Sequence, residues 1–293
     1  MVAVSCLVAV YPEVSAKLYF SRGEYQAASG IFVKNYIDQS QEFALCAVVL
    51  VYPVMALWHA GTVLGLVTAV SIPYLMITRH EIRPDSAFGG WLMPVVPPMV
   101  SAATGALLVP YAPAGQTRLT LLVACYAMFG VSLFATLVLL PQIWSKLVTH
   151  GPGPARAVPT LWIVLGPLGQ SVTAANALGN VAGDALPAPY AHAASALGVF
   201  YGLPTLGFGL LWMAIAGAVT LRTVRDGMPF ALTWWGFTFP VGTMATGATA
   251  LAAHTGSDAL TDLAIALYVL LVTAWAIVAT RTFRHALTPA AIS

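Results

Sequence analysis

The chain has 293 residues, of which 59% are hydrophobic and only 8% are charged, and its formal net charge is +2. A soluble domain carries about 25% charged residues and could not cover its surface with so few, so the composition excludes a soluble protein and indicates an all-α polytopic membrane protein. The small net charge gives no reason to expect nucleic acid as a partner.

Along the chain, residues 1–41 predict a short apolar segment over 1–20 and a polar loop over 21–41. A transmembrane domain is expected over 42–286 and a cytoplasmic tail over 287–293. Within that domain, eight predominantly apolar runs each approach the ~20 residues that a spanning helix needs. They cover residues 42–58, 60–77, 90–111, 119–144, 159–180, 190–220, 228–253 and 259–280. A tight turn at 59–61 would join the first two, and the eight would pair as four hairpins.

Basic residues alternate between the connecting segments. Every second segment, together with the C-terminal tail, holds Lys17, Arg22, Lys34, Arg79, Arg83, Lys146, Arg156, Arg222, Arg225, Arg281 and Arg284, and the intervening turns hold only Arg118. Basic loops face the cytoplasm in most membrane proteins. We therefore expect a multi-pass protein of the plasma membrane with Arg83, Arg225 and the C-terminus inside, and with Asp184 and Ser257 outside.

Features of catalytic or metal sites are weak in this sequence. Cys6, Cys46 and Cys125 lie in apolar runs without CxxC spacing, which favours buried packing thiols. The charged loops at 80–85 (HEIRPD) and 222–226 (RTVRD) lack metal-ligand spacing. We expect no catalytic residue, no metal ligand and no cofactor. A membrane enzyme and a purely structural or accessory subunit remain as alternatives.

Prolines lie well inside the first helix of each expected hairpin: Pro53, Pro97 or Pro98, Pro167 and Pro240. Since proline removes a backbone hydrogen bond and bends a helix, this predicts a repeated unit with bent inner helices around an axis. The helices of Pro167 and Pro240 are expected to bend at mid-membrane and to face each other across that axis. The second helices also hold prolines, namely Pro73, Pro141 and Pro204, so the pattern is a tendency.

One face of the run 228–253 is small or weakly polar, with a single bulky member. On a continuous helix this face would hold Gly236, Phe239, Pro240, Thr243, Thr246, Gly247 and Ala250. It fits a narrow pathway with an aromatic plug, and it equally fits close packing between membrane helices. Removing the Phe239 ring should raise flux under the first interpretation and destabilise the protein under the second.

The runs 90–111 and 159–180 carry faces of the same type, with no charged side chain at mid-membrane depth. Such faces can line a water-filled path without binding an ion tightly, and they argue against a buried carboxylate relay. His59, His192 and His254 lie at span ends and are interpreted as interfacial residues. The candidate lining residues are Pro98, Ser101, Thr104, Gly166, Pro167, Gln170, Thr173, Gly236, Pro240, Thr243 and Gly247.

Three motifs carry a family resemblance: GGWLMPVVPPMVSAATG at 89–105, PTLWIVLGPLGQS at 159–171 and PFALTWWGFTFPVG at 229–242. They resemble the tellurite-resistance/dicarboxylate transporter family, which includes malate permeases, sulfite exporters, the tellurite-resistance protein and plant slow anion channels. The GPLGQ form is most similar to the malate-permease and sulfite-exporter branch. The resemblance covers residues 42–285.

This resemblance implies ten helices in five hairpins about a pore within each subunit, usually in a homotrimer. It implies that an aromatic residue of the ninth helix blocks the pore, which places the gate at Phe239, with Phe237 as the reserve choice. The eight expected spans match the last eight helices, so we expect the first hairpin to be missing or incomplete. The implied substrates are small anions: dicarboxylates such as malate, or sulfite or tellurite. A passive channel for chloride or nitrate is the alternative.

Overall fold

The structure is a computed structural model that describes residues 36–83 and 85–287, with side chains described from residue 54 onward. Every regular element of these residues is a helix, which confirms the all-α prediction. The expected N-terminal apolar run, the loop after it as far as residue 35, and the last six residues of the tail lie outside the described residues.

The chain divides into two compact units, Met1–Ala60 and Gly61–Ser293. Helix α3 (Tyr36–Arg79) contributes to both and runs without interruption through residues 59–61. The predicted tight turn there was wrong. Gly61 is the only weak helix former at this point, and one glycine costs about 1 kcal/mol relative to alanine, too little to stop a helix among Met, Ala and Leu.

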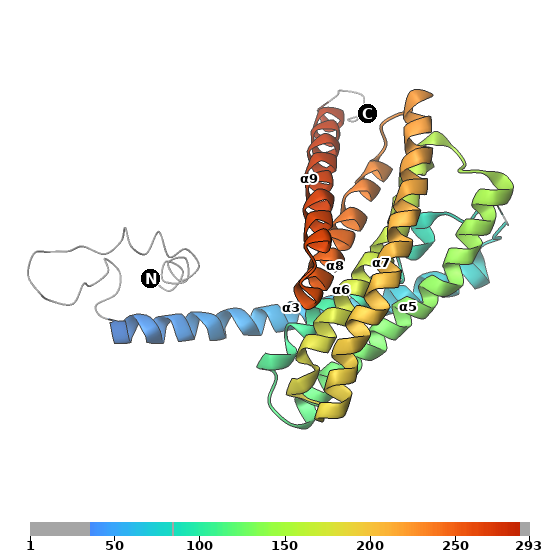
Figure 1. Ribbon diagram of the computed structural model, residues 1–293. Coiled ribbons are helices and arrows are strands. Elements are labelled where there is room, and N and C mark those ends of the chain that lie inside the picture. Colours follow the sequence, from blue (N-terminus) through green and yellow to red (C-terminus); the bar gives the residue numbers. More distant parts are fainter. Residues whose placement is uncertain (1–35, 84, 288–293) are drawn as a thin grey trace, which may run out of the picture. The chain divides into compact units, whose positions relative to one another are not determined.

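Three repeats of one pattern make up most of the second unit, and in each a 3₁₀ segment and a short α-helix precede a long α-helix (Figure 1). The first repeat is η1 (Gly89–Leu92), α4 (Pro97–Ala106) and α5 (Gln116–His150). The second is η3 (Ala155–Val164), α6 (Leu165–Val181) and α7 (Ala188–Arg225). The third is η5 (Leu232–Phe237), α8 (Phe239–Thr255) and α9 (Asp258–Ala286). Two further 3₁₀ segments, η2 (Val109–Tyr111) and η4 (Ala182–Asp184), follow α4 and α6.

The helices confirm a polytopic membrane protein. Among the described residues, five stretches are long and apolar enough to cross a bilayer: Val54–Arg79, Gln116–His150, Ala155–Asp184, Ala188–Arg225 and Asp258–Ala286. The expected continuous helices over 90–111 and 228–253 were wrong, because each is broken into a 3₁₀ segment and an α-helix. The α-helical parts, α4 and α8, have only 10 and 17 residues.

Proline explains the position of these breaks. Pro97 begins α4, Pro167 is the third residue of α6 and Pro240 is the second residue of α8. Proline has no N–H and its ring displaces the carbonyl four residues earlier, so it suits the first turn of an α-helix, whereas in the interior it costs a backbone hydrogen bond.

Backbone carbonyls near the breaks accept hydrogen bonds from neighbouring helices. Trp212 Nε1 donates to the Leu161 carbonyl at 2.9 Å, and Thr243 Oγ1 donates to the Leu165 carbonyl at 3.1 Å. Ser132 Oγ donates in the same way to the Val95 carbonyl. Irregular backbone survives at membrane depth only when its polar groups are satisfied by protein or water. The second unit meets that condition through side chains on adjacent helices.

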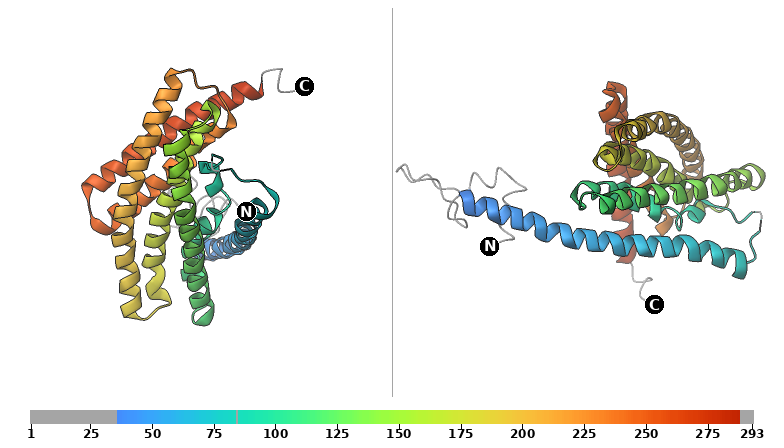
Figure 2. Two further views of the ribbon diagram at one scale, coloured as in Figure 1. Left: turned by 90° about the vertical axis from the view of Figure 1, so that its right-hand side faces the viewer. Right: turned by 90° about the horizontal axis from the view of Figure 1, so that it is seen from below.

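Contacts between the helices fix their directions. Asn176 of α6 packs against Gly198 of α7, and Gly179 packs against Ser195, so these two helices are antiparallel. Trp144 and Phe129 of α5 pair with Trp212 and Tyr201 of α7, so α5 and α7 run in the same direction. Figure 2 shows α5, α6 and α7 alongside one another. Helix α9 is antiparallel to α8, as the contact between Trp234 of η5 and Arg281 shows.

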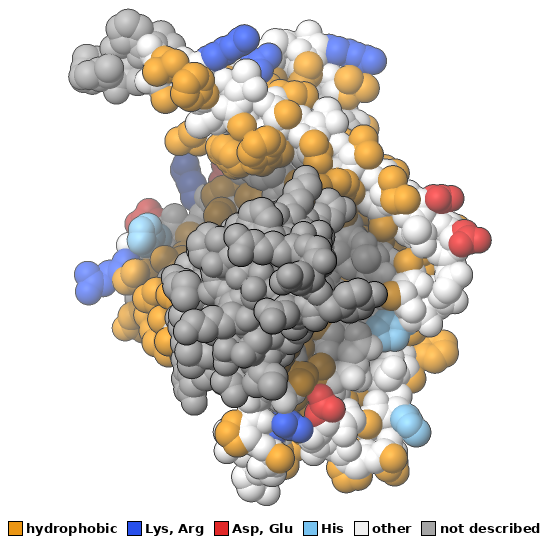
Figure 3. Space-filling model, turned by 90° about the vertical axis from the view of Figure 1, so that its left-hand side faces the viewer, with side chains coloured by type: hydrophobic (Ala, Val, Ile, Leu, Met, Phe, Trp, Pro, Cys, Tyr) orange, Lys and Arg blue, Asp and Glu red, His pale blue; other side chains and the backbone are white. Residues whose placement is uncertain are grey.

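The C-terminal ends of α5, α7 and α9 therefore share one end of the second unit. The basic residues at that end are Lys146, Arg156, Arg222, Arg225, Arg281 and Arg284, whereas Arg118 lies near the start of α5 at the other end. Figure 3 shows basic side chains gathered at its upper edge, the level at which α9 ends in Figure 1. The alternation of basic residues thus fits the helix directions of this unit, and which end is cytoplasmic stays a prediction.

Helix α6 lies at the centre of the main hydrophobic core. Leu165, Leu168 and Val172 of α6 pack with Trp212 of α7 and Met244 of α8 in one buried cluster. Cys125 is a buried free thiol, as its apolar setting predicted.

Candidate functional site

Three side-by-side pairs define the interface between α6 and α8. The ring of Phe239 lies over Gly166, with its Cε1 atom 3.4 Å from where a methyl group on that glycine would be. The second pair is Thr173 and Thr246, whose hydroxyl oxygens are 2.9 Å apart. The third pair is Asn180 and His254, with 2.6 Å between Asn180 Oδ1 and His254 Nε2. Because the residue numbers of the three pairs increase together along both helices, α6 and α8 run in parallel.

The backbones of α6 and α8 touch between the first two pairs. A methyl group added at Gly169 would lie 2.4 Å from the carbonyl carbon of Thr243, and one added at Gly247 would lie 3.1 Å from the Gly169 carbonyl oxygen. Thr243 is buried and donates to carbonyls of both helices. The prediction that these two helices face each other across an axis was therefore wrong. Their small residues let them approach directly, as the packing interpretation allowed.

Phe239 occupies the edge of this interface. Its side chain is 50% exposed, although the residues on either side of it, Thr238 and Pro240, are buried. Phe237, the reserve gate candidate, instead packs edge-on against Trp162 and Trp234, at 5.5 and 5.9 Å between ring centroids. Of the two, only Phe239 presents its ring to an open face.

Four threonine hydroxyls on α4, α6 and α8 are exposed or half-buried. Thr246 and Thr249 are exposed on α8, Thr173 is half-buried on α6, and Thr104 is exposed on α4. Each hydroxyl donates to a carbonyl of its own helix; Thr104 Oγ1, for example, donates to Val100 O at 2.8 Å. We refer to these uncharged, weakly polar groups as the hydroxyl wall; of the four, Thr173 and Thr246 meet across the α6–α8 interface.

The other predicted lining residues lie deeper. Gly236 is in η5, where an added methyl group would lie 2.7 Å from the Pro159 carbonyl oxygen. Helix α4 packs on α6. The buried members of the predicted set are Pro98, Ser101, Gly166, Pro167, Gln170, Pro240, Thr243 and Gly247.

The third pair was missed from the sequence. His254 was interpreted as an interfacial residue, and Asn180 was assigned only to the end of a span. A signal was present, since Asn180 follows Thr173 by seven residues and His254 follows Thr246 by eight. Two helical turns separate the members of each set, so each set lies on one face of its helix. Nothing in the sequence showed that the two faces meet.

Charge is nearly absent from the three short helices. Helices α4, α6 and α8 contain no Asp, Glu, Lys or Arg, and His254 is their one titratable side chain. Within the described part of the chain, no group of three or more His, Cys, Asp or Glu side chains could hold a metal ion.

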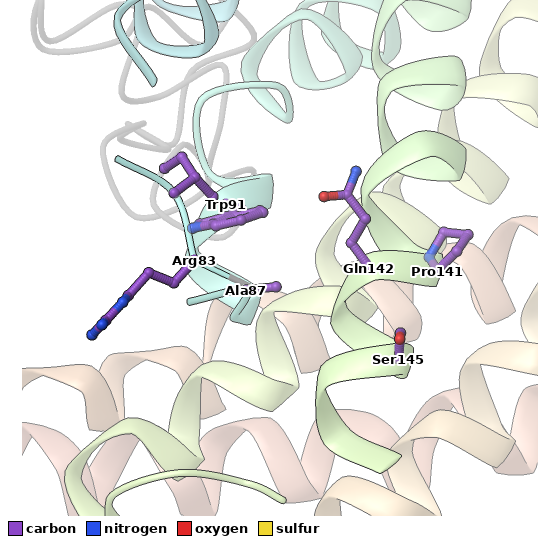
Figure 4. Close-up of a pocket in the computed structure, with 7 residues that line it drawn as sticks. Arg83, Ala87, Trp91, Pro141, Gln142 and Ser145 are labelled. Atoms are coloured by element: carbon purple, nitrogen blue, oxygen red, sulfur yellow. The ribbon is translucent and has the colours of Figure 1, made fainter. Parts of the chain in front are cut away.

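A separate cavity of about 420 Å³ lies between η1 and α5. Figure 4 shows Trp91 on one side and Gln142 and Ser145 on the other, with Arg83 extending away from α5. No lining residue of this cavity belongs to α6 or α8. It is therefore a different feature from the interface.

Comparisons with known proteins identify the family of this chain. The family model described as "Voltage-dependent anion channel" matches residues 30–283. A sulfite efflux pump of Trichophyton rubrum is 30% identical over 199 residues, covering 66% of this chain and 52% of the pump. A sulfite efflux pump of Arthroderma otae is 29% identical over the same shares. An uncharacterized transporter of Methanocaldococcus jannaschii is 29% identical over 187 residues, covering 63% of this chain and 51% of that protein.

The chain spans about half the length of these curated relatives. No solved structure shows a significant match to it. The names of the family and of its relatives describe a channel, pumps and a transporter and not enzymes, in agreement with the sequence-based expectation. With a family match over most of its length and three motifs in the broken helices, the chain belongs to the voltage-dependent anion channel family.

Proposed function

We propose that this protein carries small anions across a membrane along the open face of the α6–α8 interface, with Phe239 as the gate. The observation that carries the proposal is the half-exposed ring of Phe239 over Gly166, at one end of an uncharged wall of hydroxyl groups. An apolar ring in a narrow path excludes water and thereby stops ions. Rotation of the ring about its side-chain bonds would rewet the path.

The hydroxyl wall supports conduction over tight binding. Thr173, Thr246 and Thr104 each donate to a backbone carbonyl in this structure. Each hydroxyl can turn away from its carbonyl and donate to a passing anion. It then gains a hydrogen bond to the anion but loses the one to the backbone. The net gain per contact is small, and weak, repeated contacts let an ion enter and leave.

Sulfite is the first substrate to test, because the relatives from Trichophyton rubrum and Arthroderma otae are named as sulfite efflux pumps. Malate and tellurite follow from the family resemblance of the three motifs. Chloride and nitrate represent the alternative of a passive channel. All of these anions meet the same neutral wall.

The test is a panel of labelled sulfite, malate, tellurite, nitrate and chloride in proteoliposomes that contain the purified chain, beside protein-free liposomes. We expect sulfite flux above the protein-free level. A preparation that retains its helical fold but passes none of the five anions would refute transport by this chain. An imposed proton gradient then distinguishes a passive channel from a proton-coupled carrier, since only the coupled carrier responds to the gradient with uphill uptake of the anion.

We also propose a plasma-membrane protein with a cytoplasmic C-terminus, assembled as a homotrimer with one pathway in each subunit. The alternation of basic residues supports the orientation and the family resemblance supports the trimer. In a background without native cysteines, Asp184→Cys and Ser257→Cys should react with an impermeant thiol reagent added outside intact cells. Arg83→Cys and Arg225→Cys should react only after permeabilisation, and labelling of either in intact cells would overturn the orientation.

A further inference from the structure

His254 makes two contacts at the end of the α6–α8 interface. Its Nδ1 atom is 2.9 Å from the Ala250 carbonyl oxygen, one turn earlier in α8. Its Nε2 atom is 2.6 Å from Oδ1 of Asn180 on α6. Both ring nitrogens therefore face carbonyl-type oxygens, one from the backbone and one from a side-chain amide.

The two contacts of His254 can persist when the ring gains or loses a proton. A backbone carbonyl only accepts hydrogen bonds, so Nδ1 donates to the Ala250 carbonyl, and Nε2 of a charged ring donates to the amide oxygen of Asn180. A neutral ring fits the same position only when the amide of Asn180 turns over, so that its NH₂ group donates to Nε2. The contact between His254 and Asn180 is therefore possible with the protonated and with the neutral ring, but only the protonated ring carries a charge.

The surroundings supply no ionic partner for a charged His254 ring. The titratable groups that the adjoining elements bring to the same end are Asp184 of η4, Tyr190 and His192 of α7, and Asp258 and Asp262 of α9; α6 has none. No carboxylate among the described residues forms an ion pair with His254. His254 lies in the last turn of α8, near the partial negative charge that the C-terminal end of a helix carries.

We propose that His254, held in place by Asn180, is a proton-dependent anion-binding group at the end of the pathway opposite Phe239. This proposal rests on the proposed function, because it places the group on the same interface. Both N–H groups are already engaged, so an anion is held by charge and not by a directed hydrogen bond. The group therefore takes small anions as a class, including bisulfite, nitrate and chloride, and binds them loosely enough for passage.

The first test measures nitrate flux in proteoliposomes of the full chain at pH 5.5 and pH 8.0. Nitrate keeps its charge over this range, whereas histidine side chains change theirs between about pH 5 and 8. We expect flux to be about tenfold faster at pH 5.5 than at pH 8.0. In His254→Gln, which keeps a hydrogen-bonding amide, the two rates become equal. In His254→Lys, which keeps a charge at both pH values, flux is fast at both.

His192→Gln is the matched control, since His192 is exposed on α7 at the same end and lies outside the interface. It should retain the tenfold ratio. The proposal is overturned if His254→Gln retains that ratio or if His254→Lys follows the pH profile of the unaltered chain. A role limited to joining α6 and α8 would alter stability in the variants without removing the pH dependence.

A second measurement is independent of transport. Binding of an anion and of a proton at one group are reciprocal, so each strengthens the other. In protein labelled with ¹³C at its histidines, replacing gluconate by nitrate at constant ionic strength should raise the titration midpoint of the His254 signal by about 0.3 pH unit or more, a twofold coupling. The His192 signal should not move. An unchanged His254 midpoint overturns the proposal whether or not the chain passes nitrate, and absent flux with a shifted midpoint refutes only the proposed transport.

Discussion

The short inner helices and the long outer helices of the second unit are built from similar residues and differ in how their backbones are satisfied. Of the 18 residues at the apolar centre of each span, 78% are buried in Ala155–Asp184, which contains α6, against 28% in α5 and in α7 and 11% in α9. The outer helices continue for 29 to 38 residues, whereas α4, α6 and α8 have 10 to 17.

Proline alone does not explain this difference. Pro141 and Pro204 lie inside α5 and α7, which continue through them. Near Pro204, Thr205 donates to the Tyr201 carbonyl of its own helix. Near Pro167, the carbonyls of Leu161 and Leu165 accept from Trp212 of α7 and Thr243 of α8. The breaks before Pro97 and Pro167 thus lie where a neighbouring helix donates to a nearby carbonyl, as Ser132 of α5 does to Val95.

The contact between backbones at Gly169 gives the most severe test of the inner region. A methyl group there would lie 2.4 Å from the Thr243 carbonyl carbon, and backbone atoms cannot move aside as a flexible side chain can. We expect Gly169→Ala to destabilise the protein by about 3 kcal/mol, the upper part of the overpacking range. Thermal unfolding in detergent micelles measures the loss.

Gly207→Ala is the control for this change in the outer region. Gly207 lies inside α7 and an added methyl group there meets no atom within 4 Å. Alanine is the better helix former, so the free energy of unfolding of Gly207→Ala should equal that of the unaltered chain or exceed it by up to about 1 kcal/mol. Equal destabilisation by both substitutions would contradict a close-packed inner region.

Phe239→Ala tests whether the inner region encloses a path. Its ring is half-exposed beside uncharged hydroxyl groups, so removal should widen and wet the path and raise anion flux about tenfold, equivalent to about 1.4 kcal/mol. Ordinary packing predicts a destabilised protein with lower flux. Flux per folded molecule in proteoliposomes distinguishes the two by sign.

The control for the gate is Phe200→Ala, because Phe200 is 77% exposed on the outer helix α7. Its flux should equal that of the unaltered chain. A well-folded Phe239→Ala protein with unchanged flux, or an equal rise in Phe200→Ala, would count against a gate at Phe239.

The smallest expected effect compares two threonine hydroxyls. Thr243→Val removes a hydrogen bond from α8 to the Leu165 carbonyl of α6, and Thr205→Val removes one within α7. Hydrogen bonds between membrane helices average about 0.6 kcal/mol, so Thr243→Val should lower stability by about that amount. Thr205→Val should change stability less. If Thr205→Val lowers the free energy of unfolding more than Thr243→Val does, hydrogen bonds from neighbouring helices do not stabilise the broken backbone.

The sequence predicted the class of protein and the long helices α5, α7 and α9. These follow from hydropathy and from periodicity, which are local properties. It did not predict the 3₁₀ segments before Pro97, Pro167 and Pro240. Pro141 and Pro204 have the same local chemistry, and the difference depends on which helix lies beside them.

The same limit applies to the candidate site. Gly166, Thr173 and Asn180 could each be placed on one face of their helix from the sequence. Their partners Phe239, Thr246 and His254 could be identified only once α6 and α8 were seen to touch. Pairing between helices distant in the sequence is set by the whole packing arrangement and not by either segment.

The spacing of the three pairs along α6 and α8 has a mechanical consequence. The partners are separated by 73, 73 and 74 positions in the chain, so one register serves all three contacts. Sliding α6 by a single turn, about 5.4 Å, would misalign every pair at once, and the next register that could bring pairs together lies about 10.5 Å away. The three contacts consequently hold α6 and α8 in one register. An opening motion can turn a side chain or tilt both helices as one body, but it cannot proceed by small slips between them.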